Sequence, residues 1–446
     1  MKLRNIILFI LAAIALTACD DFLDITPTGK VIAKTGEEYR ALLTYEYKYF
    51  SKDRYMTTLR TDELLMDKKK SSSTDLDAYL DLWRWKDENP SPTTSYFSWR
   101  GYYHTIYIAN YVIEHRDEIT NATRDEVNQL VGEAYMLRAY CHFLLVNLYA
   151  EPYTHCQPAT TRGVPMQLAA DVNAIPGSSS VDAIYQQVLS DVAEAEKYLH
   201  VETWEEGTNY RFNKISAQAL RARTYLYMGE WQKALTAAKA VIEAHGELED
   251  LNTSTTLPNS YKSVESIVAL EKFSGNLFTV IDMPAPDFLN LYRTGDQRRT
   301  KFYKRVTSST YNLQKGGDDE FSCSFRSAEA YLTAAECAAR LGNTAEAIDF
   351  LKPLLQKRLN ATALQDELDL VTPMTQEALI VEILDERARE LAFEGHRWYD
   401  LRRTTRPALT RTYDDETFTL TPEKYTLRFP TEAVEANPEI ERWEKK

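Results

Sequence analysis

Three glutamates at four-residue spacing are the most prominent group in this sequence that is able to do chemistry. Glu386, Glu390 and Glu394 fall on one face of a predicted helix, and paired carboxylates can serve as acid and base in a glycosidase or bind a metal ion. Like charges at this spacing repel each other, so the three glutamates need cationic partners. Arg387 and Arg389 stand among them, and guanidinium groups match carboxylates in shape. We therefore expect a structural ion-pair network here.

No other segment carries a recognisable catalytic motif. The sequence contains no GxSxG, HExxH, GxGxxG or CxxC pattern and no phosphate-binding loop, and no two of its seven histidines have the spacing of a zinc site. We predict that the protein is not an enzyme and holds neither a cofactor nor a metal ion. Because carboxylates are plentiful, an all-α glycoside hydrolase remains the enzyme-class alternative.

Two tryptophans two residues apart, Trp83 and Trp85, are the best candidates for a ligand contact. Sugar recognition uses apolar ring faces together with carboxylates and amides that bind hydroxyl groups. In an extended segment both indoles would face the same side. Prolines follow closely and indicate a loop, in which Glu88, Asn89 and Tyr96 are the expected partners. The alternative is that one tryptophan fills the core beneath the loop.

The elements that must position these residues are predicted to be helices, because apolar residues recur every three or four positions through most of the chain. Residues 216–242 and 327–355 share a finer pattern, in which Gly229 aligns with Gly342 and an alanine follows five residues later. This pattern is similar to the tetratricopeptide hairpin, in which two helices meet at a glycine turn and cross at small residues. Such hairpins stack into a solenoid.

A third, more divergent hairpin is expected from helices over 124–149 and 181–199, and short strands are expected near 265–270 and 417–428. The predicted fold class is therefore all-α. It consists of tetratricopeptide-like helical hairpins packed with a larger helical and loop-rich ligand-binding region, and it has few short strands. The low glycine count, 15 of 446 residues, agrees with a fold that has few tight turns.

The first residues predict export and a lipid anchor. Lys2 and Arg4 precede an apolar run over 6–18, which is too short to span a bilayer and is typical of a signal peptide. The run ends in Leu-Thr-Ala-Cys, which resembles the bacterial lipobox. In that motif a peptidase removes residues 1–18, and the thiol of Cys19 receives a diacylglycerol. Acylation at Cys19 would attach the chain to a membrane.

The charge and the cysteines limit the possible partners and cross-links. Lys and Arg number 52 and Asp and Glu number 66, which gives a net charge of −14 and argues against nucleic-acid binding. The four cysteines other than Cys19 are predicted to be free thiols, because two of them lie among small apolar residues of predicted helices. Disulfides remain the alternative for an exported protein.

Several motifs, taken in order, resemble the SusD/RagB family of outer-membrane nutrient-binding lipoproteins. The resemblance covers nearly the whole chain after residue 18, which we divide into regions 19–245 and 246–446. Its segments are CDDFLD at 19–24, EAYMLRAYCHFLLVNLYAEPY at 133–153, NKISAQALRARTYLYMGEWQKA at 213–234, FRSAEAYLTAAECAARLGNTAEAI at 325–348 and ILDERARELAFEGHRWYDLRRT at 383–404. Two departures are Ala150, where the family usually has glycine, and Arg428-Phe429-Pro430 in place of the common Pro-Ile-Pro.

This resemblance implies a surface-exposed outer-membrane lipoprotein that is not an enzyme. It would bind a nutrient and deliver it to a SusC-like TonB-dependent transporter. The nutrient would be an oligosaccharide or polysaccharide, and the alternative is a peptide. In starch-binding relatives a Trp-x-Trp arrangement from this part of the chain forms an aromatic arc, which supports Trp83 and Trp85. The interaction-class alternative is a tetratricopeptide scaffold lipoprotein without a small ligand.

The resemblance also places the second half of the ligand site within 270–320. Tyr292 and Tyr303 are the candidates there, together with Phe273 and Phe278. Asp296 and Arg298 match a family motif and are expected to hold the loop in place.

Overall fold

The computed structural model describes residues 33–66, 72–271, 282–308, 310–315 and 321–440. The predicted signal peptide, the acylation site Cys19 and the candidates Phe273 and Phe278 lie outside the described residues. Within the described part, no helix combines the length and the apolar character needed to cross a bilayer.

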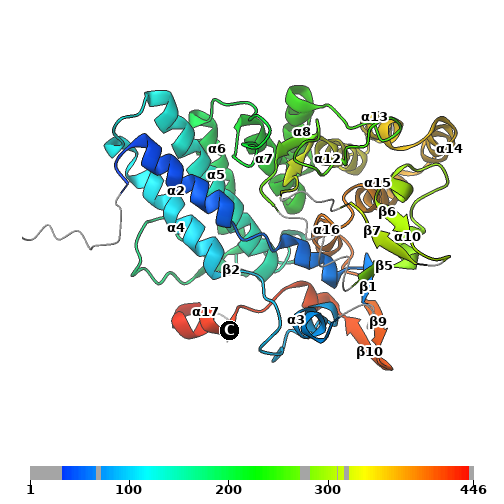
Figure 1. The fold of residues 1–446 in the computed structure, drawn as a ribbon, viewed down its shortest axis with the longest axis horizontal. Coiled ribbons are helices and arrows are strands. Elements are labelled where there is room, and N and C mark those ends of the chain that lie inside the picture. The colour runs from blue at the N-terminus through cyan, green and yellow to red at the C-terminus, as the bar shows by residue number, and fades with distance from the viewer. Residues whose placement is uncertain (1–32, 67–71, 272–281, 309, 316–320, 441–446) are drawn as a thin grey trace, which may run out of the picture.

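A row of helical hairpins forms the centre of the molecule, and the predicted all-α class is confirmed (Figure 1). Each helix packs on the next one in the row. The helices are α5 (Arg124–Tyr149), α6 (Val181–Tyr198), α7 (Lys214–Met228), α8 (Trp231–His245), α12 (Ser327–Arg340) and α13 (Thr344–Arg358). The third hairpin, α5 with α6, is therefore present as predicted. The predicted division at residue 245 coincides with the end of α8 and stays a prediction.

The aligned glycines end the first helix of two hairpins. Gly229 and Gly342 have φ angles of 76° and 85°, a left-handed conformation that glycine adopts without strain. The N–H of Glu230 donates to the carbonyl oxygen of Tyr225 at 3.0 Å, and the second hairpin repeats this bond at 2.9 Å. The alanine five residues after each glycine is fully buried. The local pattern thus predicted both turns correctly.

The N-terminal helices pack on the α5 end of this row (Figure 1). Helices α2 (Gly36–Tyr49) and α4 (Arg100–Glu114) pack on each other and on α5. Between them in sequence come η1 (Arg54–Arg60), β1 (Leu64–Met66) and α3 (Ser73–Trp83). Short turns of helix follow at η2 (Arg116–Glu118) and η3 (Tyr153–His155).

The C-terminal part packs first on α12 and α13 and then returns to η1 and α3. It contains α14 (Ala361–Val371), α15 (Gln376–Glu390), α16 (Arg397–Arg403), η4 (Pro422–Tyr425) and α17 (Thr431–Ala436). A hairpin of β9 (Leu409–Tyr413) and β10 (Glu416–Leu420) lies between α16 and η4. This return brings residues near 420 beside α3, far from them in sequence (Figure 1).

The remaining strands form two-stranded antiparallel sheets. In two of these sheets the strands are far apart in sequence, and in the other two they are consecutive. Strand β1 pairs with β5 (Asp282–Pro284), and β4 (Ser266–Val268) pairs with β8 (Phe325–Arg326). The other pairs are β2 (Arg162–Pro165) with β3 (Ser178–Ser180) and β6 (Tyr303–Arg305) with β7 (Tyr311–Leu313). The one-turn helices α10 (Pro286–Leu289) and α11 (Arg298–Lys301) precede β6. Strands β4 and β10 occur where short strands were predicted.

The three glutamates of α15 and its continuation belong to a buried ion-pair network, as predicted. The carboxylate of Glu390 accepts from Arg326 at 2.7 Å, Arg358 at 2.8 Å and Arg298 at 3.1 Å. Burial alone would raise the pKa of Glu390, but the guanidinium groups hold it well below its usual value. The network also includes Glu265, Glu386, Glu394 and Lys315. It ties α15 to α13 and β8, which is a structural role.

The described cysteines are free thiols, as predicted. Cys141, Cys323 and Cys337 are buried, and Cys156 is half-buried. Burial raises the pKa of each of the three buried thiols. These groups therefore stay protonated at neutral pH and pack as small apolar side chains.

Candidate ligand-binding groove

The two candidate tryptophans do not form an exposed platform, which corrects the prediction. Helix α3 ends at Trp83, and Trp85 has a φ of 57°, so the segment is not extended. Both indoles are buried, with 1% and 0% of their surface exposed. The guanidinium group of Arg411 lies over both rings, 4.7 Å from the centroid of Trp83 and 4.3 Å from that of Trp85. The helix end and the left-handed residue turn both rings under the β9–β10 hairpin.

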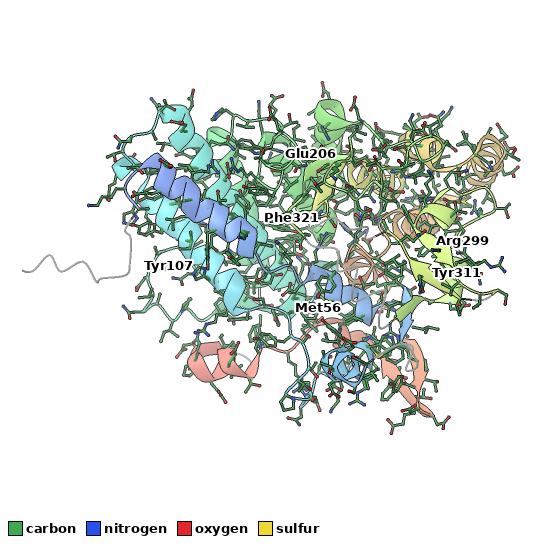
Figure 2. The ribbon with its side chains drawn as sticks, in the orientation of Figure 1. Met56, Tyr107, Glu206, Arg299, Tyr311 and Phe321 are labelled. Atoms are coloured by element: carbon green, nitrogen blue, oxygen red, sulfur yellow. The ribbon has the colours of Figure 1, made fainter. Side chains whose placement is uncertain are left out.

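Tyr292 and Tyr303 are also buried, contrary to their expected role at a ligand surface. Their hydroxyl oxygens lie 2.9 Å apart, and the Tyr292 hydroxyl donates to the carbonyl oxygen of Arg389 at 2.8 Å. Burial raises the pKa of both phenols. Nearby on the surface, the Arg299 guanidinium lies 4.0 Å from the ring centroid of Tyr311 (Figure 2). The two buried tyrosines therefore attach this region to the end of α15.

The expected loop anchor at Asp296 and Arg298 is present. The Arg298 guanidinium donates to the Asp296 carboxylate at 2.8 Å and also reaches Glu386 at 2.6 Å. Both members of the pair are buried. The family motif thus joins this loop to the ion-pair network.

The polar candidates of the loop after α3 are exposed. Tyr96 has 71% of its surface exposed, and Glu88 and Asn89 also face solvent. The Glu88 carboxylate accepts a hydrogen bond from the Arg428 guanidinium. Of the seven predicted ligand-binding residues, Trp85 and Glu88 line an open groove of the described structure.

This groove is open and has a volume of about 900 Å³. One wall is the segment 84–88, and the other is the stretch from β10 through η4 to residue 428. The lining residues are Arg84, Trp85, Lys86, Asp87, Glu88, Glu151, Arg162, Phe418, Thr421, Glu423, Lys424, Thr426, Leu427 and Arg428. Ligand sites of proteins typically have volumes of about 300–1,000 Å³, so the groove can accept several sugar units.

Ion pairs hold the 84–88 wall of the groove in position. The buried Arg60 guanidinium binds the Asp87 carboxylate through two hydrogen bonds of 2.7 and 2.9 Å. Arg84 and Lys86 share the buried Asp81 carboxylate at 2.5 and 3.7 Å. These contacts fix the 84–88 wall while leaving charged groups at its rim.

The opposite wall supplies both acceptors and donors. Hydrogen bonds from its own backbone and from Thr421 lower the pKa of Glu423, which therefore stays a carboxylate at neutral pH. The Lys424 ammonium donates to the carbonyl oxygen of Thr419 at 3.4 Å, and the Phe418 ring is half-buried. Carboxylates, ammonium and guanidinium groups around a partly apolar floor are suited to binding hydroxyl-rich ligands.

Of the two walls, only the 84–88 wall contains residues that the sequence analysis names as ligand candidates, and their role in binding stays a prediction. Residues 270–320 were expected to complete the site, but none of their described members lines this groove. The only sequence signal for the second wall was Arg428, which stands where the family pattern has proline. The described residues contain no group of three or more His, Cys, Asp or Glu side chains arranged to hold a metal ion.

The described part of the chain thus combines a row of helical hairpins with an open polar groove between residues 84–88 and 418–428. The family model described as "Starch-binding associating with outer membrane" matches residues 21–226, and the "SusD family" model matches residues 279–441. The chain therefore belongs to the SusD/RagB family of outer-membrane-associated binding proteins.

Individual relatives agree with this assignment over nearly their whole length. Two SusD-like proteins of Formosa agariphila are 24% and 21% identical, and the alignments cover 91% and 90% of this chain and 92% and 90% of theirs. A SusD superfamily structure from Bacteroides thetaiotaomicron has a TM-score of 0.77 at 24% identity, covering 91% of this chain and 99% of that one. A laminarin-binding SusD-like protein has a TM-score of 0.64 at 18% identity, covering 83% and 92%.

Proposed function

We propose that this protein binds a nutrient oligosaccharide or polysaccharide at the surface of the outer membrane and delivers it to a SusC-like TonB-dependent transporter. The observation that carries the proposal is the match of both halves of the chain to SusD-type family models, one of them described as starch-binding and associated with the outer membrane. The lipobox-like sequence before Cys19 supports attachment to that membrane.

The groove between residues 84–88 and 418–428 is the proposed binding site. Its rim carries Glu88 and Arg428, whose side chains are 70% and 66% exposed. Charged groups at such a rim can exchange their mutual hydrogen bond for bonds to sugar hydroxyls at little cost, since exposed ion pairs contribute only about 0–1 kcal/mol. The half-buried Phe418 ring offers an apolar face to the same ligand.

Affinity electrophoresis of the purified chain in gels that contain starch, laminarin, pectin or mannan tests the ligand class. We expect at least one polysaccharide to retard the protein. If none of them retards the protein and the protein binds members of a peptide library, the ligand is a peptide and not a glycan. An assay for new reducing ends on the same polysaccharides tests the glycosidase alternative, and we expect no turnover.

Purification from native outer membranes tests the proposed partner. We expect a tagged chain to bring down a β-barrel transporter in a mild detergent. Recovery of the acylated chain as a single species without any barrel would contradict the delivery step and would favour the scaffold alternative.

A further inference from the structure

The loop between β2 and β3, residues 166–177, is unusually apolar for an exposed segment. Asp171 is its one charged residue, although 26% of the whole chain is charged. Leu168, Val172 and Ile175 have 41%, 77% and 58% of their surface exposed. They account for three of the eleven large apolar side chains that are exposed in the described part of the chain. Single exposed apolar residues are ordinary, but a group of them on one loop marks an interaction site.

Helix α4 fixes the position of this loop. The side-chain amide of Asn110 donates to the carbonyl oxygens of Gln167 and Ala169 at 3.2 and 3.1 Å. Near the end of α4, the Glu114 carboxylate accepts a hydrogen bond from the Ala170 N–H at 3.0 Å. The tip of the loop therefore lies beside the C-terminal end of α4.

The described chain begins at this same end of α4. Shortly after α4, Thr120 donates its N–H to the carbonyl oxygen of Lys34 at 2.8 Å and accepts from Gly36 at 2.9 Å. Figure 1 shows the β2–β3 loop and the start of α2 at the same side of the molecule. The apolar loop and the point where the N-terminal segment joins the fold are thus neighbours.

The N-terminal segment connects this end to the membrane if Cys19 is acylated. Cys19 stands 14 residues before Ala33 (33 − 19), and a chain of that length spans at most about 50 Å. The net charge of −14 makes most of the protein surface unfavourable next to anionic lipid. The loop itself adds one negative charge, and its three exposed aliphatic side chains gain free energy when a bilayer buries them.

We propose that the β2–β3 loop contacts the lipid surface to which the protein is anchored and thereby sets the orientation of the molecule on the membrane. This inference rests on the lipid anchor of the proposed function. The anchor keeps the loop at a high effective concentration near the bilayer, so a weak contact is enough. The apolar loop therefore contacts lipid, namely the lipids of the membrane surface beside the anchor.

The test uses the full acylated chain in vesicles of phosphatidylethanolamine and phosphatidylglycerol. A polarity-sensitive fluorophore is attached to V172C or, as the matched control, to V381C on α15, where the native valine is 59% exposed. Both variants carry C156S to remove the half-buried thiol. We expect a blue shift at position 172 and quenching by lipids brominated about 5–10 Å below the headgroups, and neither effect at position 381.

Two outcomes would overturn the proposal in different ways. Mass spectrometry of the N-terminal peptide reports acylation at Cys19, and its absence would remove both the anchor and the loop contact. An acylated chain whose label at position 172 responds like the label at 381 would overturn the loop contact alone. A second test uses an acylated chain that carries V172D and no fluorophore. On vesicles, the backbone amides of residues 166–177 should exchange hydrogen faster in this variant than in the wild-type chain. In solution, their exchange should be unchanged.

Discussion

The guanidinium group of Arg411 covers the indole ring of Trp85, with 4.3 Å between the guanidinium carbon and the ring centroid. Arg411 is 6% exposed and donates to the carbonyl oxygens of Leu59 at 2.7 Å and Trp83 at 2.5 Å. One side chain of β9 therefore fixes the end of α3 and the end of η1. This contact gives the groove a firm floor and takes Trp85 out of reach of a stacking ligand.

The substitution Arg411→Ala should destabilise the fold by about 3 kcal/mol or more, because it leaves buried carbonyl groups without a donor and opens a cavity between two indoles. Urea unfolding followed by tryptophan fluorescence measures the change. The exposed Arg428→Ala variant is the control and should change the free energy of unfolding by less than about 1 kcal/mol. Equal effects of the two substitutions would show that Arg411 has no special structural role.

The rim pair of the groove should contribute to ligand binding. Glu88→Ala and Arg428→Ala each remove a charged hydrogen-bonding group, so we expect each to lower the affinity for the polysaccharide that retards the wild-type chain by about ten-fold. Titration calorimetry with an oligosaccharide of that glycan gives the affinities. Alanine substitutions in the exposed pair Lys214 and Glu202, whose side chains are 54% and 67% exposed, are the matched controls and should leave the affinity unchanged. Unchanged affinity in both rim variants would place the ligand elsewhere.

Glu390→Gln should be among the most destabilising polar substitutions in the chain. It leaves the buried guanidinium groups of Arg326 and Arg358 facing a neutral amide, and breaking buried pairs of this kind typically costs about 3–5 kcal/mol. Thermal and urea unfolding measure the loss. Glu194→Gln removes one member of the exposed pair with Lys197 and should have almost no effect. A Glu390→Gln chain as stable as wild type would show that the network is dispensable.

The stability of the protein should depend on pH through Asp53. Burial raises the pKa of this carboxyl group from 3.8 to about 7, although hydrogen bonds from Tyr102 and the Ser98 N–H oppose the change. Between those values the folded chain holds a proton that the unfolded chain releases. This contribution to stability is therefore present at low pH and is lost as pH rises from about 4 to about 7.

The Asp53→Asn variant isolates that contribution. Relative to this variant, the wild-type chain should lose stability between about pH 4 and about pH 7, at about 1.4 kcal/mol for each pKa unit of the shift. Urea unfolding at both pH values gives the difference, with the exposed Asp366→Asn substitution as a control. A difference between wild type and Asp53→Asn that does not change with pH would contradict the prediction.

The helical hairpins could be predicted because their signals are local. The repeat of apolar residues and the glycines at 229 and 342 each act within one or two turns of helix, and the same residues end the helices in the fold. The structural role of the α15 glutamates could also be predicted, since buried like charges require cationic partners. Which arginines supply them could not, because Arg326 stands 64 residues before Glu390.

The site could be predicted only in part. Residues near 84–88 were expected to border a ligand, and Glu88 does line the groove. The side to which Trp83 and Trp85 turn depends on Arg411, which lies 328 residues after Trp83 in the sequence. The local sequence around Trp83 and Trp85 does not predict that distant contact.

The sequence by itself determined the class of fold and the family, because these depend on periodicity and on motifs in a fixed order. Only the tertiary structure decided which surfaces are open. The C-terminal segment returns over α3, buries both tryptophans and adds the second wall of the groove, while the loop beside α4 keeps its aliphatic side chains exposed. Burial depends on contacts between segments hundreds of residues apart, so it is settled by the packing of the whole chain.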